Sequence, residues 1–244
     1  MKAIELKNGV YWVGVIDWAV RDFHGYVTPR GTTYNNYLIM DDEVTLLDTV
    51  KYDFADITIK NIRSVVEPSK IKHVVINHIE NDHVTSIDKI MALTPDATIY
   101  ITEKGRKGLD RFFDISKWNI KIVKTGDTLK IGKRTLLFIE TPMLHWPDSM
   151  MTYIKEEKIL ISQDAFGQHI ASAVRFDDEF ATCESMSELE DAIIDYYANI
   201  LMPFGQIIKT KTAEIQKMGL EMDMIAPDHG IIWRSNPQKV LQMY

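Results

Sequence analysis

Three common features are scarce or missing in this 244-residue sequence. There is a single cysteine, Cys183, which excludes an internal disulfide and a metal cluster held by several thiolates. No stretch of about 18 consecutive apolar residues occurs, so we expect no membrane-spanning helix. Lys and Arg number 28 against 35 Asp and Glu, and the net charge of −7 argues against a nucleic-acid partner.

We also expect no flexible linker and no signal peptide within this sequence. We find no repeat, no low-complexity segment and no linker rich in Gly, Ser or Pro. The N-terminal stretch MKAIELKNGVYWVGVIDW lacks the continuous apolar segment and the cleavage site of a signal peptide. The composition, 45% hydrophobic and 26% charged, is typical of a soluble globular protein with a substantial core. We therefore expect one domain over residues 1–244, located in the reducing cytoplasm.

The order of the expected elements predicts an α/β fold. Short runs that alternate apolar and polar residues begin the chain, with a hairpin turn at Asp41-Asp42. Helical periodicity then covers residues 54–66, 104–113, 187–200 and 204–218. Between these helices lie the expected strands IKHVVIN, ATIYIT, NIKIVK, TLLFIE, MTYIK, KILIS and MDMIAP. Strands and helices mixed in this way are typical of a layered α/β sandwich.

Ligand-type side chains are concentrated in the stretch NHIENDHVTS, which follows the strand IKHVVIN. It contains two imidazoles and two carboxylates within six residues: His78, Glu80, Asp82 and His83. If the chain stays extended after the strand, His78 and Glu80 point to the same side, because side chains two residues apart share a face.

A helix is expected to begin shortly after these residues. Thr85 and Asp88 fit a capping box, which places the helix start near Ser86. Asp82 and His83 then lie in the tight connection between strand and helix. All four ligand-type side chains are thus expected to project from one strand end.

Three more ligand-type residues follow strand ends. His145 follows TLLFIE, Asp164 follows KILIS, and His229 follows MDMIAP. Open α/β sheets bind ligands beyond the carboxyl ends of their strands. We therefore expect four strand ends to bring seven side chains to one rim: His78, Glu80, Asp82, His83, His145, Asp164 and His229.

Four imidazoles and three carboxylates predict two metal ions rather than one. A tetrahedral zinc ion uses three or four protein ligands, so seven are too many for a single ion. If one carboxylate bridges, each ion has four protein ligands and an open position. A mixed nitrogen and oxygen set without thiolates favours iron or manganese. The other histidines, His24, His73 and His169, are taken as structural or supporting residues.

The motif His-x-Glu-x-Asp-His, followed by a His, an Asp and a last His at strand ends, resembles the metallo-β-lactamase-like domain of flavodiiron proteins. Other stretches agree with this resemblance: HGYVTPRGTTYNNYLI, ETPMLHWPDSM, SQDAFGQH, YYANILMPF and PDHGIIWR. The resemblance covers nearly the whole chain and implies an αββα sandwich with a non-haem diiron centre. Hydrolytic members of that superfamily typically have His where Glu80 stands, whereas Glu marks the iron-binding oxygen and nitric oxide reductases.

The resemblance also implies roles for single residues. One iron would be held by His78, Glu80, His145 and Asp164, and the other by Asp82, His83, Asp164 and His229, with Asp164 bridging. His24, Tyr26 and Tyr196 match positions near the open face of the family's site, where they could hydrogen-bond dioxygen. Asn81 and the pair Val84-Thr85 depart from the family's commoner residues, and Asn81 is expected to affect the surroundings of the metals.

Three functional hypotheses follow. Enzymes of the family continue into an FMN-carrying flavodoxin domain, but only 15 residues follow His229 here and no phosphate-binding Gly-rich loop or other flavin site is found. The first hypothesis is therefore a diiron oxygen (or iron) sensor that binds dioxygen and contacts a signalling partner, for example in chemotaxis. The alternative is an oxygen or nitric oxide reductase domain whose electrons come from a separate or truncated-away flavodoxin partner. A metal-dependent hydrolase is the third, and Glu80 argues against it. A homodimer is expected by resemblance.

Overall fold

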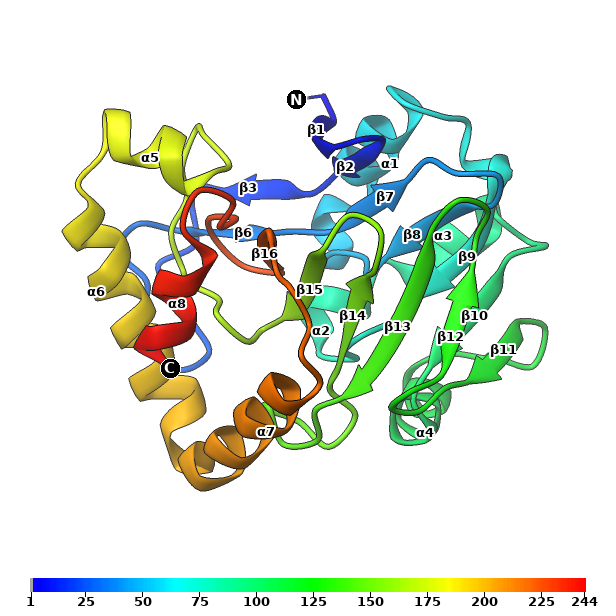
Figure 1. Cartoon of the computed structure of the whole chain (residues 1–244). Coiled ribbons are helices and arrows are strands. Elements are labelled where there is room, and N and C mark those ends of the chain that lie inside the picture. Colours follow the sequence, from blue (N-terminus) through cyan, green and yellow to red (C-terminus); the bar gives the residue numbers. More distant parts are fainter. Residues whose placement is uncertain (1) are drawn as a thin grey trace.

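The central strands are apolar on both faces because each sheet lies between the other sheet and a layer of helices (Figure 1). The computed structural model of the chain describes residues 2–244. Every residue of the strands β8 (Val44–Leu47), β14 (Met150–Ile154), β15 (Ile159–Gln163) and β16 (Met224–Pro227) is buried. Such strands form where both faces of a sheet are covered.

The first sheet has seven strands in the order β1-β2-β7-β8-β9-β10-β11. Its remaining members are β1 (Ile4–Lys7), β2 (Val10–Trp12), β7 (Tyr37–Ile39), β9 (Ile71–Val75), β10 (Thr98–Ile101) and β11 (Asn119–Ile122). Pairing is antiparallel from β1 to β8 and parallel from β8 to β11. The expected hairpin turn at Asp41-Asp42 is confirmed, since it joins the antiparallel strands β7 and β8.

The second sheet has five strands in the order β12-β13-β14-β15-β16, with β12 (Thr128–Lys130) and β13 (Thr135–Glu140) at one side. Only the last pair, β15 and β16, is parallel. Two small ribbons complete the strands: β3 (Val15–Asp17) with β6 (Thr32–Tyr34), and β4 (Asp22–Phe23) with β5 (Tyr26–Val27).

Helices form the two outer layers. The first sheet is covered by α1 (Ala55–Arg63), α3 (Ile87–Leu93) and α4 (Glu103–Phe112), and the short α2 (Asn81–Val84) precedes α3. The second sheet is covered by α5 (Asp177–Cys183), α6 (Met186–Tyr196), α7 (Gly205–Lys217) and α8 (Pro237–Met243). Single turns lie at Tyr52–Phe54, Pro68–Lys70 and Met202–Phe204, and a π-helical segment at Tyr197–Leu201 follows α6.

Three apolar clusters match these layers. One lies between the sheets and includes Trp12, Leu47, Phe138 and Ile161, while the other two lie between each sheet and its helices. The arrangement confirms the predicted αββα sandwich. Within residues 2–244, no helix has the combined length and apolar character needed to cross a membrane.

The expected capping box is wrong. No side chain caps α3 at Ser86. The hydroxyl of Thr85 instead accepts a hydrogen bond from the backbone of Tyr52 at 2.9 Å and donates one to the carbonyl of Asn81 at 2.5 Å. The hydroxyl of Thr85 makes these two hydrogen bonds and so does not cap α3. The segment before it is already a helical turn, α2, and not the tight connection that was expected.

Candidate metal centre

Four segments from both sheets bring the predicted side chains to one rim of the sandwich. His78 and Glu80 lie on the extended segment after β9, where Glu80 has φ −61° and ψ 152°. The helical turn α2 then places Asp82 and His83 beside them. The other three residues follow the ends of β13, β15 and β16, and they are His145, Asp164 and His229. The structure thus brings together all seven residues that the strand-end pattern predicts.

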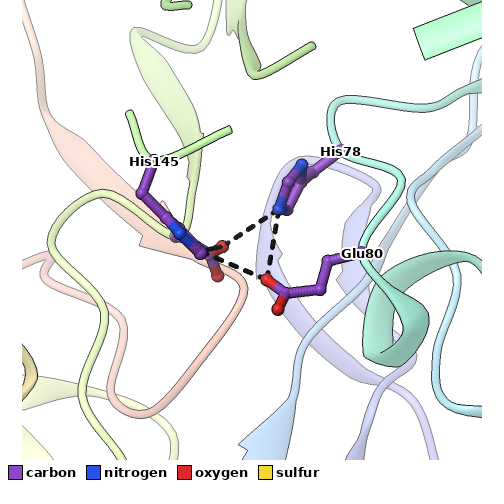
Figure 2. Close-up of side chains that lie close together, drawn as sticks. His78, Glu80 and His145 are labelled. Atoms are coloured by element: carbon purple, nitrogen blue, oxygen red, sulfur yellow. Dashed lines mark hydrogen bonds and ion pairs between the residues drawn. The ribbon is translucent and has the colours of Figure 1, made fainter. Parts of the chain in front are cut away.

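The first group of four consists of His78, Glu80, His145 and Asp164, whose ligand atoms all lie within 4.8 Å of one another. Oε2 of Glu80 lies 3.3 Å from Nε2 of His78 and 3.2 Å from Nε2 of His145. Figure 2 shows these three side chains pointing toward a common centre. The expectation that His78 and Glu80 share a face is confirmed.

The second group consists of Asp82, His83, Asp164 and His229. Oδ2 of Asp82 lies 3.0 Å from Nε2 of His229 and 3.4 Å from Nε2 of His83. These four side chains are all buried, so the group has little access to bulk water.

Asp164 belongs to both groups and divides its two oxygens between them. Its Oδ2 lies 3.1 Å from Nε2 of His145 and 3.5 Å from Nε2 of His78. Its Oδ1 lies 3.1 Å from Nε2 of His83 and 3.4 Å from Nε2 of His229. A carboxylate in this position can bridge two cations, one on each oxygen.

The outer nitrogens of two imidazoles have hydrogen-bond partners that aim Nε2 into the site, and a carboxylate lies near the outer nitrogen of a third. Nδ1 of His78 donates to Oδ2 of Asp148 at 3.1 Å, and Nδ1 of His229 donates to the carbonyl oxygen of Thr33 at 2.6 Å. Nδ1 of His83 lies 3.5 Å from Oδ2 of Asp228. Partners of this kind fix the tautomer and the ring orientation of metal-binding histidines.

Positive charge is strongly favoured at this rim. Burial opposes the charge on His78, but hydrogen bonds to Asp148 and Glu80 outweigh it and raise the pKa of His78 to about 10. For His145 burial also opposes the charge, yet hydrogen bonds to Asp164 and Glu80 raise its pKa to about 9. Burial works against the ionised form of Asp164, but the neighbouring His83 and hydrogen bonds from His145 and His83 hold its pKa well below its usual range. The carboxylates therefore stay ionised and attract cations.

The donor set fits a pair of metal ions. Within residues 2–244, several buried ligand-type atoms have no hydrogen-bond partner, and four of them face one another in the second group: Asp82 Oδ2, His83 Nε2, Asp164 Oδ1 and His229 Nε2. Buried polar atoms normally have partners, so a missing partner calls for an explanation. A cation bound among these atoms would satisfy them, and the three carboxylates of the two groups would offset three of the four charges of two divalent ions.

A cavity of about 460 Å³ leads to the two groups and is lined by residues that include His24, Glu80, Asn81 and Asp82. Nε2 of His24 lies 3.5 Å from Oε1 of Glu80, and Asn81 is exposed at the mouth. Burial lowers the pKa of His24 below its ordinary value. The structure therefore places His24 and Asn81 at the open side of the site.

The two predicted tyrosines lie farther back. Tyr196 is fully buried, with its ring centroid 6.3 Å from that of His24 and its hydroxyl without a partner among residues 2–244. Tyr26 packs on His169, with ring centroids 5.7 Å apart, and lines a separate cavity of about 220 Å³. A hydrogen bond from Tyr26 or Tyr196 to dioxygen stays a prediction.

Residues that support the ligands were missed in the sequence. Asp148 and Asp228 both lie within three residues of a predicted ligand, in the stretches LHWPD and PDH. A carboxylate so close to a candidate histidine was a usable signal. The expectation that His169 is a structural or supporting residue agrees with its position, since its Nε2 lies 3.0 Å from Nδ1 of His24.

The fold and the rim together define a metallo-β-lactamase-like protein with places for two metal ions. A family model described as "ODP family beta lactamase" matches residues 32–230. The chain belongs to this family, and it corresponds to the metallo-β-lactamase-like diiron domain of flavodiiron proteins. The resemblance inferred from the motifs is thereby confirmed.

Individual relatives match nearly the whole chain. The nitric oxide reductase of Moorella thermoacetica is 46% identical over 243 residues, which cover 99% of this chain and 60% of that protein. The structure of rubredoxin oxygen:oxidoreductase from Desulfovibrio gigas has a TM-score of 0.95 at 39% identity and covers 100% of this chain and 60% of that chain. For the flavodiiron protein from Giardia intestinalis the TM-score is 0.93 at 40% identity, covering 99% and 58%. The chain thus spans about 60% of the length of these relatives. Flavodiiron proteins carry a non-haem diiron site, and the donor set of this chain fits such a site.

Proposed function

We propose that the chain is the diiron domain of an oxygen or nitric oxide reductase and receives its electrons from a flavin-containing partner. The observation that carries this proposal is the division of the two oxygens of Asp164 between two groups of nitrogen and oxygen ligands. The names of the relatives from Moorella and Desulfovibrio support the reaction class. Glu80 adds an oxygen donor to the first group, which suits iron.

In this proposal each group holds one iron ion. The first ion would be bound by His78, Glu80, His145 and Asp164, and the second by Asp82, His83, Asp164 and His229. Asp164 would offer one oxygen to each ion, while Asp148 and the carbonyl of Thr33 hold the imidazoles of His78 and His229 in position.

Iron bound by these residues would pass electrons from the donor to a diatomic gas. Four electrons and four protons convert one dioxygen into two waters, and two electrons and two protons convert two nitric oxides into one nitrous oxide and one water. The residues around the cavity bind and orient the gas. Nε2 of His24 lies 3.5 Å from Oε1 of Glu80, and the rings of Phe23 and Trp146 line the same cavity. Donors placed in a partly dry site act more strongly than they would in water.

Electrons have to enter from outside the iron pair, because two ferrous ions hold fewer electrons than dioxygen needs. A flavin-containing domain or protein that docks near the 460 Å³ cavity is the donor in this proposal. The word rubredoxin in the name of the Desulfovibrio relative supports a chain of small electron carriers. A homodimer, expected from the resemblance, stays a prediction.

The comparisons favour this alternative over the sensor hypothesis. Two of the reported relatives are named as reductases, and none of the three is named as a sensor, a chemotaxis protein or a hydrolase. The argument for a sensor depended on where this chain ends, and the relatives extend well beyond the region they share with it. The reductase is therefore the better-supported function.

The experiment is a turnover assay. The metal-free protein is loaded with ferrous iron without oxygen, then given nitric oxide or dioxygen together with reduced flavodoxin and its reductase. We expect repeated consumption of gas, on the order of 10 per second and per site, the median for enzymes. Protein without iron, under the same conditions, is the control.

Consumption that stops after about one reaction per iron pair with several flavin donors would contradict the reductase and favour the sensor. Tight binding of zinc with hydrolysis of an ester or lactam, and no gas consumption, would favour the hydrolase.

A further inference from the structure

A chain of hydrogen bonds runs from the core to the cavity through side chains outside the two ligand groups. Oγ1 of Thr32 lies 2.8 Å from Nδ1 of His169, and Nε2 of His169 lies 3.0 Å from Nδ1 of His24. The far end of this chain, Nε2 of His24, has no hydrogen-bond partner among residues 2–244 although it is buried. The direction of the hydrogen bonds decides whether His24 offers the cavity a donor or an acceptor.

Two arrangements of protons use both hydrogen bonds with neutral imidazoles. In the first, the hydroxyl of Thr32 donates to His169, Nε2–H of His169 donates to His24, and His24 has its own proton on Nε2. In the second, both bonds are reversed and the hydroxyl of Thr32 donates to the carbonyl oxygen of Thr33, 3.3 Å away. His24 then has a bare Nε2.

The surroundings of His24 favour the first arrangement. A bare Nε2 would lie 3.5 Å from Oε1 of Glu80 and close to the carboxylate of Asp82. All of these atoms are hydrogen-bond acceptors, so none could donate to another. A buried acceptor without a donor destabilises the fold. The first arrangement instead aims an N–H at these oxygens, and the hydroxyl of Thr32 then donates over 2.8 Å to His169 rather than over 3.3 Å to Thr33.

Packing holds the rings in place for these bonds. Phe23 stacks on His24 with centroids 4.3 Å apart and meets His169 edge-on at 4.8 Å. Thr32 is fully buried and His169 nearly so, so water has little access to the bonds between them. A single proton arrangement can therefore persist.

We propose that Thr32 and His169 are positioning residues that keep the proton of His24 on Nε2, so that His24 presents a hydrogen-bond donor to a diatomic ligand in the cavity. The identity of that ligand, dioxygen or nitric oxide, rests on the proposed function. The tautomer of His24 does not depend on it.

Nitrogen NMR of protein with ¹⁵N-labelled histidine tests the tautomer directly, because a protonated and a bare ring nitrogen differ widely in chemical shift. The protein is loaded with Zn²⁺, which is diamagnetic. We expect both His24 and His169 to carry a proton on Nε2 and a bare Nδ1. A bare Nε2 on His24 in the wild-type protein would overturn the proposal.

Two matched substitutions test the role of Thr32. Thr32→Ser keeps a hydroxyl and should keep the wild-type shifts of His24. Thr32→Val keeps the shape without the hydroxyl, and His24 should then populate both tautomers, with averaged or doubled signals. Unchanged His24 shifts in Thr32→Val would show that Thr32 does not set the tautomer.

A second pair at His169 keeps the test open if Thr32→Val does not fold. The amide of His169→Gln can still donate to Nδ1 of His24, whereas His169→Leu cannot. We expect a single His24 tautomer in the first variant and two in the second. The same single tautomer in both would overturn the role of His169.

Kinetic measurements then test whether the N–H of His24 donates a hydrogen bond to the bound gas. With iron and a flavin donor, Thr32→Val should raise KM for nitric oxide or dioxygen about three- to tenfold, as expected for one lost hydrogen bond, and Thr32→Ser should not. Unchanged KM in a variant with mixed tautomers would contradict a donor role toward the gas. Absence of turnover in the wild type would reject the proposed reductase function. It would not affect the proposed tautomer of His24, which the NMR measurement tests without turnover.

Discussion

At the scale of single residues, Asp164 organises the site. It is fully buried, and each of its oxygens lies 3.1 Å from an imidazole nitrogen of a different ligand group. The seven candidate ligands could be predicted from the sequence because ligand-type residues at several strand ends point to one rim. The partners behind them could not be assigned in the same way. Asp148 is 70 positions from His78, and Thr33 acts through a backbone carbonyl that its side chain does not reveal.

Removing the shared carboxylate should remove both metals. Asp164→Ala takes a ligand from each ion and leaves two cations facing each other with less negative charge between them. We expect nearly complete loss of iron, measured by elemental analysis of protein purified after reconstitution. The control is Asp53→Ala, since Asp53 lines the cavity, is mostly exposed and belongs to neither ligand group.

Two irons per chain retained in Asp164→Ala would show that Asp164 does not bridge. Loss of only one iron would assign it to a single ion.

Glu80 is expected to set the choice of metal. Glu80→His replaces an oxygen donor with a softer nitrogen donor, which should shift the preference from iron toward zinc. The bound metals are measured after offering equal amounts of ferrous iron and zinc to the variant and to the wild type. An iron-to-zinc ratio equal to that of the wild type would place Glu80 outside the ligand set.

At the scale of elements, the loops after the strands position the ligands. The places of most strands and of the longer helices along the chain follow from apolar periodicity, which the sequence displays, whereas the order of the strands within each sheet does not. The turn α2 could not be predicted because Asn81–Val84 is too short for periodicity, and α5 and α8 were missed for the same reason at seven residues each. Contacts between distant segments hold such short helices: the carboxylate of Asp177 in α5 accepts backbone hydrogen bonds from residues 234–236.

Gly230 illustrates how a loop fixes a ligand. Its φ is +82°, and an added Cβ would lie 2.6 Å from the carbonyl oxygen of Gln168. In Gly230→Ala, the left-handed backbone alone should lower the free energy of unfolding by about 1–2 kcal/mol. The contact between the added Cβ and Gln168 should lower it further. Since His229 precedes it, the variant should also lose iron.

The matched control is Gly126→Ala, whose φ is +95° but whose added Cβ would meet nothing within 4 Å. Gly126→Ala should lower the free energy of unfolding by the amount due to the left-handed backbone, and it should keep its iron. Urea unfolding and elemental analysis measure the two effects, and equal stability losses with full iron content in both variants would contradict this account of Gly230.

At the scale of the whole molecule, the site joins the two sheets. The segment after β9 comes from the first sheet, and the loops after β13, β15 and β16 come from the second. Metal ions held between them should therefore stabilise the sandwich as well as carry out chemistry. The sequence indicated the layers, but the closeness of the two sheets at this rim depends on packing among residues far apart in the chain.

Removal of the metals should lower the stability of the protein. A ligand that binds only the folded state stabilises it by about 2.7 kcal/mol when its free concentration is 100 times its Kd. Calorimetry should show a lower Tm after treatment with a chelator, and recovery when ferrous iron is added without oxygen. An unchanged Tm in protein shown to be free of metal would mean that the site does not couple the two sheets.

The most direct test of the central claim is an anomalous difference map of the iron-loaded crystal, recorded on both sides of the iron absorption edge. We predict two iron peaks per chain, one within bonding distance of His78, Glu80 and His145, the other within bonding distance of Asp82, His83 and His229. Each peak should contact a different oxygen of Asp164. A single peak, or two peaks of which one does not contact Asp164, would contradict the account.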